Sequence, residues 1–255
     1  MASRTTGSPA SVLDDREQAA TPIGPDGRLI VALDVSTHED ALRLVRNLDN
    51  VSFFKIGLQL FLAGDLFGFV ERIRSEHEDR AIFIDLKTAG DIQDTITLFV
   101  DRAGDLGIRF MTFIEAAHAA ITRKTLQAGL GARGDSRFPQ FVSVPMLSDI
   151  EWPVGEIVAS GQRQLAMGFD GLVASGSAIR ALRNAIPRST PIISPGIRPA
   201  GSNPDGHVRW TTPTEAIQAG ADYLVVGRPI TRDRDPRGMA QRIIEEIAAA
   251  RAAAP

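Results

Sequence analysis

Short apolar runs alternate with longer amphipathic stretches from Arg28 to the end of the chain. The short runs are continuous in hydrophobic residues, as the buried strands of a parallel sheet are. We predict eight strands: Leu29–Leu33, Phe53–Gly57, Ala81–Leu86, Phe110–Ile114, Phe141–Val144, Gly171–Ala174, Pro191–Ser194 and Tyr223–Val226. Strands that alternate with helices in this way indicate βα units around a parallel sheet.

The stretches between these runs carry signals for helix starts. Thr37 followed by Asp40, and Thr212 followed by Glu215, have the spacing of an N-terminal cap. Asp235 precedes a proline at the start of the last amphipathic stretch, where proline suits the first helical turn. Each predicted strand is therefore followed by a segment that can form a helix.

Eight strand–helix units predict an α/β fold of the (β/α)₈ TIM-barrel class, with one catalytic domain over residues 28–255. The competing topology is a doubly wound open sheet. That fold normally has fewer strands and a Gly-rich turn after the first one, whereas Leu33-Asp34-Val35 follows here. Residues 1–27 are rich in Ser, Thr, Ala, Pro and Gly and lack the apolar stretch of a signal peptide, so we expect a disordered N-terminal tail.

Composition narrows the class of partner. The chain has 255 residues, 44% of them hydrophobic, and a net charge of -3 with basic residues spread along its length. The sequence has no cluster of basic residues of the kind that binds nucleic acid or a membrane surface, so we expect a small-molecule partner. The chain has no cysteine, which excludes disulfides and thiolate chemistry and is compatible with the cytoplasmic location that we expect.

Several predicted strands end in charged residues. Asp34 follows the first strand, Lys55 lies in the second, and Asp85 and Lys87 end the third. Active sites of such barrels lie at the carboxyl ends of the strands, and a charge among apolar residues is costly unless it is paired or reaches a wet cavity. Asp85 and Lys87 are two residues apart, so they project to one side of the strand, within reach of Lys55. We predict a Lys–Asp–Lys array, which could be either a catalytic centre or a charged plug without catalytic use.

The ends of the last two strands favour a phosphate site. Gly227 allows the backbone to approach an anion, and Arg228 offers a planar fork for its oxygens. The turn that contains Pro195, Gly196 and Arg198 follows strand seven, and barrels commonly bind phosphate after strands seven and eight.

At these positions the sequence resembles the orotidine 5′-phosphate decarboxylase family. The matching motifs are Leu33-Asp34, Phe54-Lys55-Ile56-Gly57, Asp85-Leu86-Lys87, Pro195-Gly196-Ile197-Arg198-Pro199-Ala200-Gly201 and Val226-Gly227-Arg228-Pro229-Ile230-Thr231. The resemblance implies a homodimer that needs no cofactor or metal and converts orotidine 5′-phosphate to uridine 5′-phosphate and CO₂ in pyrimidine biosynthesis. It also implies that Asp34 and Lys55 hold the ribose, Asp85 faces the carboxylate, Lys87 donates a proton, and Arg228 with the adjoining backbone holds the phosphate.

The chain departs from the family pattern at several points. The family has an aspartate three residues after the lysine and a threonine four residues after that aspartate, and the aspartate reaches the partner's site. In this chain one extra residue stands between Lys87 and the aspartate. We align Asp91 and Thr95 with the family's aspartate and threonine. We place the insertion in the turn before Asp91, where Gly90 can absorb it. The stretch after strand five is also one residue longer, which leaves Ser148 as the contact to the pyrimidine. Glu115 stands after strand four where a histidine is common, and the expected lid, residues 199–209, has no glutamine.

Two other functions stay open on the sequence. One is a magnesium-dependent sugar-phosphate lyase of the same superfamily, of the hexulose-phosphate synthase or ketogulonate-phosphate decarboxylase type. Those relatives carry a glutamate near the position of Lys55, and a lysine there would repel a divalent cation. The other is a non-catalytic nucleotide-binding barrel that keeps only the phosphate clamp.

Overall fold

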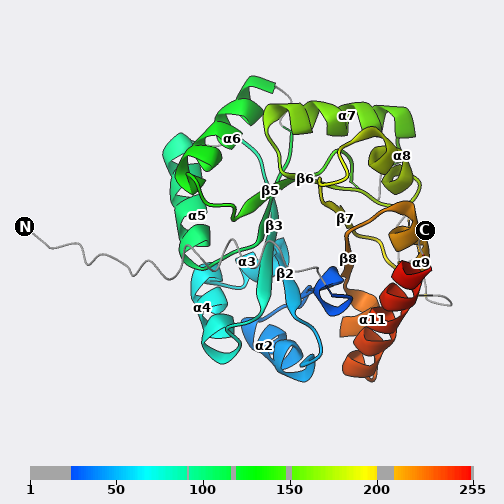
Figure 1. Ribbon diagram of the computed structural model, residues 1–255. Helices are drawn as coiled ribbons and strands as arrows, with labels where there is room; N and C mark the ends of the chain where they lie inside the picture. The colour runs from blue at the N-terminus through cyan, green and yellow to red at the C-terminus, as the bar shows by residue number, and fades with distance from the viewer. Residues whose placement is uncertain (1–23, 91, 116–118, 148–150, 200–209, 254–255) are drawn as a thin grey trace, which may run out of the picture.

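A closed barrel of parallel strands, in the order β1 to β8, forms the centre of the computed structural model, and helices surround it (Figure 1). The structure describes residues 24–90, 92–115, 119–147, 151–199 and 210–253. The strands are β1 (Leu29–Ala32), β2 (Phe53–Gly57), β3 (Ala81–Thr88), β4 (Phe110–Phe113), β5 (Gln140–Ser143), β6 (Gly171–Val173), β7 (Ile192–Ser194) and β8 (Tyr223–Val226). The eight predicted strands and the barrel topology are confirmed.

The helices lie outside the barrel and follow the strands in turn. They are α2 (His38–Asn47), α3 (Leu58–Leu62), α4 (Leu66–Glu76), α5 (Gln93–Asp105), α6 (Ala119–Arg133), α7 (Val154–Met167), α8 (Ala178–Ala185), α9 (Pro213–Ala219), α10 (Arg228–Thr231) and α11 (Pro236–Ala252). No helix among the described residues is long and apolar enough to cross a membrane.

The predicted helix caps are confirmed. Thr37 accepts a hydrogen bond from the backbone N–H of Asp40, and Thr212 forms a reciprocal capping box with Glu215. Asp235 accepts from the backbone N–H of Gly238 at the start of α11. These contacts satisfy backbone donors that the first helical turn leaves unpaired.

Two predicted boundaries differ from the structure by two residues, and several other strand ends differ by one. β3 continues past Leu86 to Thr88, because its end pairs again with Phe113 of β4 after a register shift. The chain is also ordered before Arg28, since η1 (Asp26–Arg28) forms a short turn in which Arg28 donates to the backbone oxygen of Asp222 at 2.8 Å. Residues 1–23 of the predicted tail lie outside the described residues.

The barrel interior is closed by one apolar layer, which we call the lower layer. It consists of Ile30, Phe53, Phe83, Phe110, Val142, Ile193, Tyr223 and Val225, and Ala32 packs onto it from two residues further along β1. The intervening strand residues point outwards and pack against the helices in a separate cluster, as the two-residue period of a strand requires. The lower layer thus forms a floor beneath the carboxyl ends of the strands.

Candidate active site

A second set of inward-facing side chains lies two residues further along the same strands, and we call it the upper layer. It consists of Ala32, Lys55, Asp85, Thr112, Val144, Pro195 and Gly227. Six of the seven line a pocket of about 240 Å³ at the carboxyl end of the barrel, the central pocket. This is the end at which barrels of this class hold their chemistry.

The predicted Lys–Asp–Lys array is present. Lys55 Nζ lies 3.3 Å from Asp85 Oδ2, and Lys87 Nζ lies 3.0 Å from Asp85 Oδ1. Asp34 joins it from the end of β1, with its Oδ1 3.5 Å from Lys55 Nζ. Asp85 therefore lies between two ammonium groups, and Lys55 lies between two carboxylates.

Burial makes this pairing necessary. The side chains of Lys55 and Asp85 are only 10% and 14% exposed. Burial opposes the charged form of Lys55, but attraction to Asp85 and Asp34 outweighs it and raises the pKa of Lys55 above its usual value. Burial also opposes ionisation of Asp85, yet Lys55 and Lys87 outweigh it and hold the pKa of the Asp85 carboxyl below its usual range. Both groups are therefore charged near neutral pH.

Lys87 is held by an irregular piece of strand. The pairing of β3 with β4 shifts register between Ile84 and Thr88, and Lys87 has a left-handed backbone with φ of 51°. Its N–H donates to Thr112 Oγ1 at 2.8 Å, and the Thr112 hydroxyl donates to Asp85 Oδ1 at 2.9 Å. A left-handed conformation is rare for a residue with a side chain and is found where function requires it. The bulge directs the Lys87 ammonium towards Asp85 and the pocket.

Sequence reasoning missed Thr112. It is 1% exposed in a strand of sequence Phe-Met-Thr-Phe. Its position two residues after the inward-facing Phe110 was the available signal.

The residues that we predicted to bind phosphate line the side of the central pocket opposite the Lys–Asp–Lys array. Pro195, Gly196, Arg198, Gly227 and Arg228 all line it. Gly196 has a φ of 74°, which favours glycine, and a Cβ on Gly227 would lie 3.5 Å from Asp34 Oδ2. Arg198 is buried, and its Nη1 donates to the backbone oxygen of Ile197 at 2.9 Å.

The remaining candidates are not in this pocket. Thr95 is exposed in the first turn of α5 and is not among the residues that line the central pocket. Asp91, Ser148 and lid residues 200–209 lie outside the described residues. Gly90, which precedes Asp91, has a φ of 29°, as a turn that depends on glycine can have.

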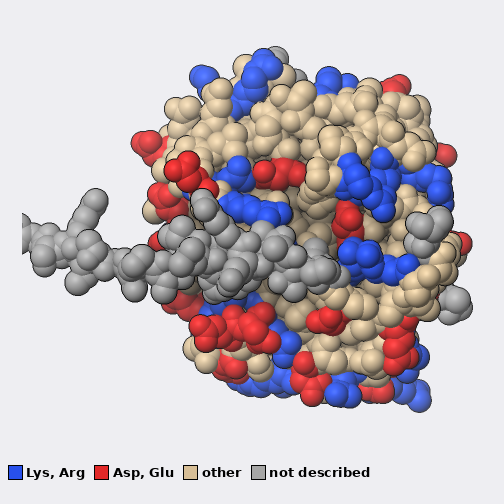
Figure 2. All heavy atoms as spheres, viewed as in Figure 1, with Lys and Arg blue, Asp and Glu red and all other residues tan. Residues whose placement is uncertain are grey.

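Charge on the face seen in Figure 2 is mixed, with acidic and basic side chains interspersed around the rim. Within the described ranges, no group of three or more His, Cys, Asp or Glu residues could hold a metal ion. Among the described residues that line the central pocket, the carboxylates are Asp34 and Asp85, and both contact Lys55.

Comparison with known proteins gives one consistent result. The model of the orotidine 5′-phosphate decarboxylase / HUMPS family matches residues 27–243. Orotidine 5′-phosphate decarboxylase from Rhodopseudomonas palustris is 38% identical over 235 residues, which cover 88% of this chain and 95% of the relative. The enzyme of the same name from Afipia carboxidovorans is 39% identical, over 90% of this chain and 98% of its own. A crystal structure of orotidine 5′-phosphate decarboxylase from Lactobacillus acidophilus superposes with a TM-score of 0.70 at 26% identity, over 86% of this chain and 98% of the other.

Proposed function

The chain belongs to the orotidine 5′-phosphate decarboxylase / HUMPS family, and from this membership we infer that it is a carboxy-lyase that converts orotidine 5′-phosphate to uridine 5′-phosphate and CO₂. One structural observation carries the proposal. A Lys–Asp–Lys array, in which Lys55 and Asp85 are largely buried and Lys87 is 40% exposed, faces a pocket whose opposite side is lined by Arg198 and Arg228. This arrangement suits a substrate with an anion at one end and a reacting carboxylate at the other.

The phosphate would lie between the ends of β7 and β8. Arg228 supplies a charged fork, and Gly196 and Gly227 let the backbone approach the phosphate oxygens closely. Because this end is remote from the bond that breaks, its binding energy can align the substrate in the pocket. We propose that Asp34 and Lys55, which line the same pocket and contact each other, hold the ribose hydroxyls.

The reaction needs a stabiliser for developing negative charge. When the C6–carboxylate bond breaks, CO₂ leaves and its electron pair remains on C6 of the pyrimidine. An ammonium group fixed where this charge develops stabilises it more strongly in a pocket that excludes water than in bulk water. The Lys87 ammonium would donate its proton to C6, which gives uridine 5′-phosphate and a neutral lysine. Asp85 would face the departing carboxylate, a like-charge contact that is relieved as CO₂ leaves.

We propose that the active enzyme is a homodimer with shared sites, in which Asp91 and Thr95 serve the partner's pocket and Ser148 contacts the base in its own. Exposed apolar side chains on elements that follow β2, β3 and β4 support an interface there. They are Leu58, Phe61, Leu62, Ile92, Leu98 and Ile121. Thr95 lies in the same region and is exposed, so it is available to a second subunit.

A subunit-mixing experiment tests the shared site. Lys87→Ala and Asp91→Ala proteins should each be inactive, but a heterodimer has one site with both residues intact. Random exchange should restore about a quarter of the wild-type activity, since half of the dimers are mixed and each has one good site. If mass spectrometry confirms exchange and the mixture is no more active than its parents, Asp91 does not act across the interface.

The magnesium-dependent lyase reading is not favoured. Asp34 and Asp85, the carboxylates that line the central pocket in the described part of the chain, are both paired with Lys55, and this ammonium would repel a divalent cation. We also propose that the enzyme works in the cytoplasm on a nucleotide, without nucleic acid, membrane or cofactor.

The direct test is to incubate the purified protein with orotidine 5′-phosphate and follow loss of the orotate absorbance with and without EDTA. We expect equal rates in both samples. Activity that EDTA abolishes would favour the magnesium-dependent lyase. Binding of uridine 5′-phosphate with no turnover would favour the non-catalytic barrel.

A further inference from the structure

The wall of the central pocket has a charged arc and an uncharged arc. The charged arc is formed by the ends of β7, β8, β1, β2 and β3 and the residues that follow them. Its charged side chains in the described part of the chain are Asp34, Lys55, Asp85, Lys87, Arg198 and Arg228. The uncharged arc lies over the ends of β5 and β6, and its described side chains are Val144, Met146, Leu147, Val173 and Ser175. A neutral part of the substrate would therefore lie against the uncharged arc.

Ser175 is the one uncharged polar side chain among the described residues that line the central pocket. The strand period sets its direction. Val173 packs on the lower layer inside the barrel, whereas Ala174 belongs to the cluster between strands and helices. Ser175 comes two residues after Val173 and therefore faces inward. Gly176, with a φ of 57°, then turns the chain towards α8.

The Ser175 hydroxyl is enclosed but has no partner. Ser175 is 4% exposed, and no described residue forms a hydrogen bond with its Oγ. Its backbone oxygen accepts from the N–H of Ala178 at 3.3 Å, so only the side chain is unpaired. The unpaired hydroxyl of Ser143 is sealed from solvent, but that of Ser175 is not. The Ser175 hydroxyl is therefore open to a molecule in the central pocket.

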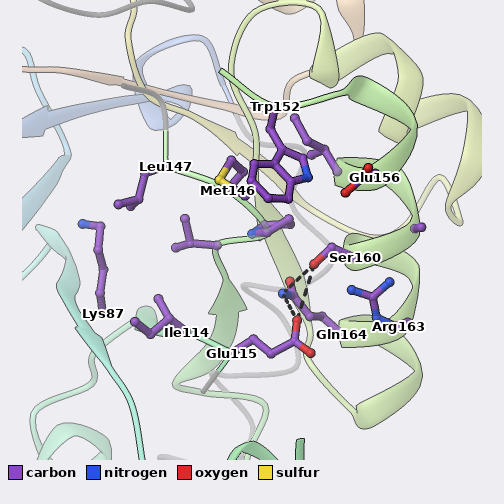
Figure 3. Close-up of a pocket in the computed structure, with 14 residues that line it drawn as sticks. Lys87, Ile114, Glu115, Met146, Leu147, Trp152, Glu156, Ser160, Arg163 and Gln164 are labelled. Atoms are coloured by element: carbon purple, nitrogen blue, oxygen red, sulfur yellow. Dashed lines mark hydrogen bonds between the residues drawn. The ribbon is translucent and has the colours of Figure 1, made fainter. Parts of the chain in front are cut away.

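The polar side chains beyond the uncharged arc are engaged with one another. Part of this arc also borders an adjoining cavity of about 600 Å³ (Figure 3). In that cavity Glu115 Oε2 accepts hydrogen bonds from Gln164 Nε2 at 3.2 Å and from Ser160 Oγ at 3.5 Å. None of these three residues lines the central pocket, so they do not compete with Ser175 for a group bound there.

The proposed reaction directs one edge of the base towards Ser175, and this step rests on the proposed function. C6 of the pyrimidine would face Asp85 and Lys87 on β3. N3, with a carbonyl on each side, is the ring atom across from C6. In the closed order of eight strands β7 lies opposite β3, and β6 is next to β7. The amide edge of the base, which consists of C2, N3 and C4 with their substituents, would therefore point towards the ends of β6 and β7.

We propose that Ser175 is a further substrate-binding residue, whose hydroxyl forms a hydrogen bond with the amide edge of the pyrimidine. A hydroxyl can donate to a carbonyl oxygen or accept from N3–H, so it suits this edge. The contact is additional to the one that we predicted for Ser148. Because it lies across the ring from the bond that breaks, it is the same before and after CO₂ leaves. It therefore contributes to binding and not to the bond-breaking step.

Binding of two ligands tests this contact. Calorimetry on the full-length wild type and on Ser175→Ala compares uridine 5′-phosphate with ribose 5-phosphate, which lacks the base. Loss of one hydrogen bond should raise the Kd for uridine 5′-phosphate about five- to tenfold. The Kd for ribose 5-phosphate should stay within about twofold, because a ligand without the amide edge has no such hydrogen bond to lose.

Turnover and stability separate this role from a structural one. In Ser175→Ala, KM for orotidine 5′-phosphate should rise by the same factor as the Kd, while kcat stays within about twofold. The urea midpoint of the ligand-free variant should not fall, because no described residue pairs with the hydroxyl that is removed.

Ser194→Ala is the matched control. Ser194 is fully buried at the end of β7, its hydroxyl donates to the backbone oxygen of Pro195 at 3.4 Å, and it does not line the central pocket. Both Kd values should be unchanged in this variant.

Three results would overturn the proposal. The first is an unchanged Kd for uridine 5′-phosphate in Ser175→Ala. The second is an equal rise in Kd for both ligands, which would place the hydroxyl on the ribose or the phosphate. The third is a lower urea midpoint with weaker binding of both ligands, which would make Ser175 structural. A wild type that binds uridine 5′-phosphate through Ser175 but does not decarboxylate would instead contradict the proposed function alone.

Discussion

The upper and lower layers of the barrel interior are built on the same strands, but only the upper layer contains charged and hydroxyl side chains. Phe53 and Lys55 lie on β2, Phe83 and Asp85 on β3, and Phe110 and Thr112 on β4, each pair two residues apart. One step of the strand period thus separates an apolar floor from a polar site. The barrel concentrates stability in one layer and chemistry in the next.

The lower layer is stabilised by ring packing. The Phe110 ring lies 5.2 Å from that of Tyr223 and 5.7 Å from that of Phe53, measured between centroids. Such pairs add to the burial of apolar area. The upper layer has no aromatic ring, and its two charged members, Lys55 and Asp85, depend on each other and on Asp34 and Lys87 for stabilisation.

The largest effect should come from Lys87→Ala. We expect kcat to fall about a thousandfold or more, because proton donation and charge stabilisation are both lost. Affinity for uridine 5′-phosphate, measured by calorimetry, should change little, because the phosphate contacts are intact. A variant that keeps a tenth of the wild-type kcat, a loss of only about 1.4 kcal/mol in barrier, would contradict a proton-donating role.

The opposite pattern should follow from Phe110→Ala in the lower layer. Truncation of a fully buried phenylalanine should reduce the free energy of unfolding by about 3–5 kcal/mol. The folded fraction should keep kcat within a few-fold of the wild-type value, because the array above remains paired. Urea denaturation with parallel activity assays measures both quantities. A large loss of kcat in fully folded protein would mean that the two layers are not separable.

Asp85→Asn should show how far the upper layer depends on charge. Without the Asp85 carboxylate, the Lys55 and Lys87 ammonium groups have no shared partner. We expect the free energy of unfolding to fall by about 3 kcal/mol. The pKa of Lys55 should fall, because burial is then opposed only by Asp34. Nitrogen NMR of the Lys55 ammonium measures this shift.

The sign of the pH dependence follows from that shift. In the wild type the raised pKa of Lys55 contributes stability that is present below the unfolded pKa of about 10.4 and is lost as pH rises through the folded pKa. In Asp85→Asn, the pKa of Lys55 in the folded protein should lie below its unfolded value. The free energy of unfolding should then rise with pH until the pH reaches the unfolded pKa. The stability gap between the two proteins should therefore narrow as pH approaches 10, and a gap independent of pH would contradict the account.

The smallest effect should come from Thr112→Val, an almost isosteric change. The Lys87 N–H loses its acceptor and Asp85 loses a donor, which should cost about 1–2 kcal/mol. The pKa of Asp85 should rise, since the Thr112 hydrogen bond is one of the causes that lower it. The stability that the lowered pKa of Asp85 gives the wild type is lost as pH falls through that pKa. The difference in free energy of unfolding between the wild type and Thr112→Val should therefore narrow below about pH 4. Thermal unfolding at several pH values measures this, and a gap that widens in acid would be inconsistent.

The alternation of eight apolar runs with amphipathic stretches predicted the barrel, and the two-residue period of a strand predicted the array. The spacing of Asp85 and Lys87, and the position of Lys55 on the neighbouring strand, predicted contacts that the structure contains. The bulge at Lys87 was not predicted, because it depends on how β3 pairs with residues more than twenty positions away. The Glu115, Ser160 and Gln164 cluster was missed for the same reason, since it joins the end of β4 to α7.

The central claim is that the upper layer replaces a carboxylate at C6 with a proton, without a metal. The most direct measurement is proton NMR of the nucleotide formed by EDTA-treated protein in D₂O. We predict uridine 5′-phosphate labelled with deuterium at C6, and one CO₂ released for each nucleotide consumed. Recovery of unchanged orotidine 5′-phosphate from folded protein that binds uridine 5′-phosphate would contradict the claim.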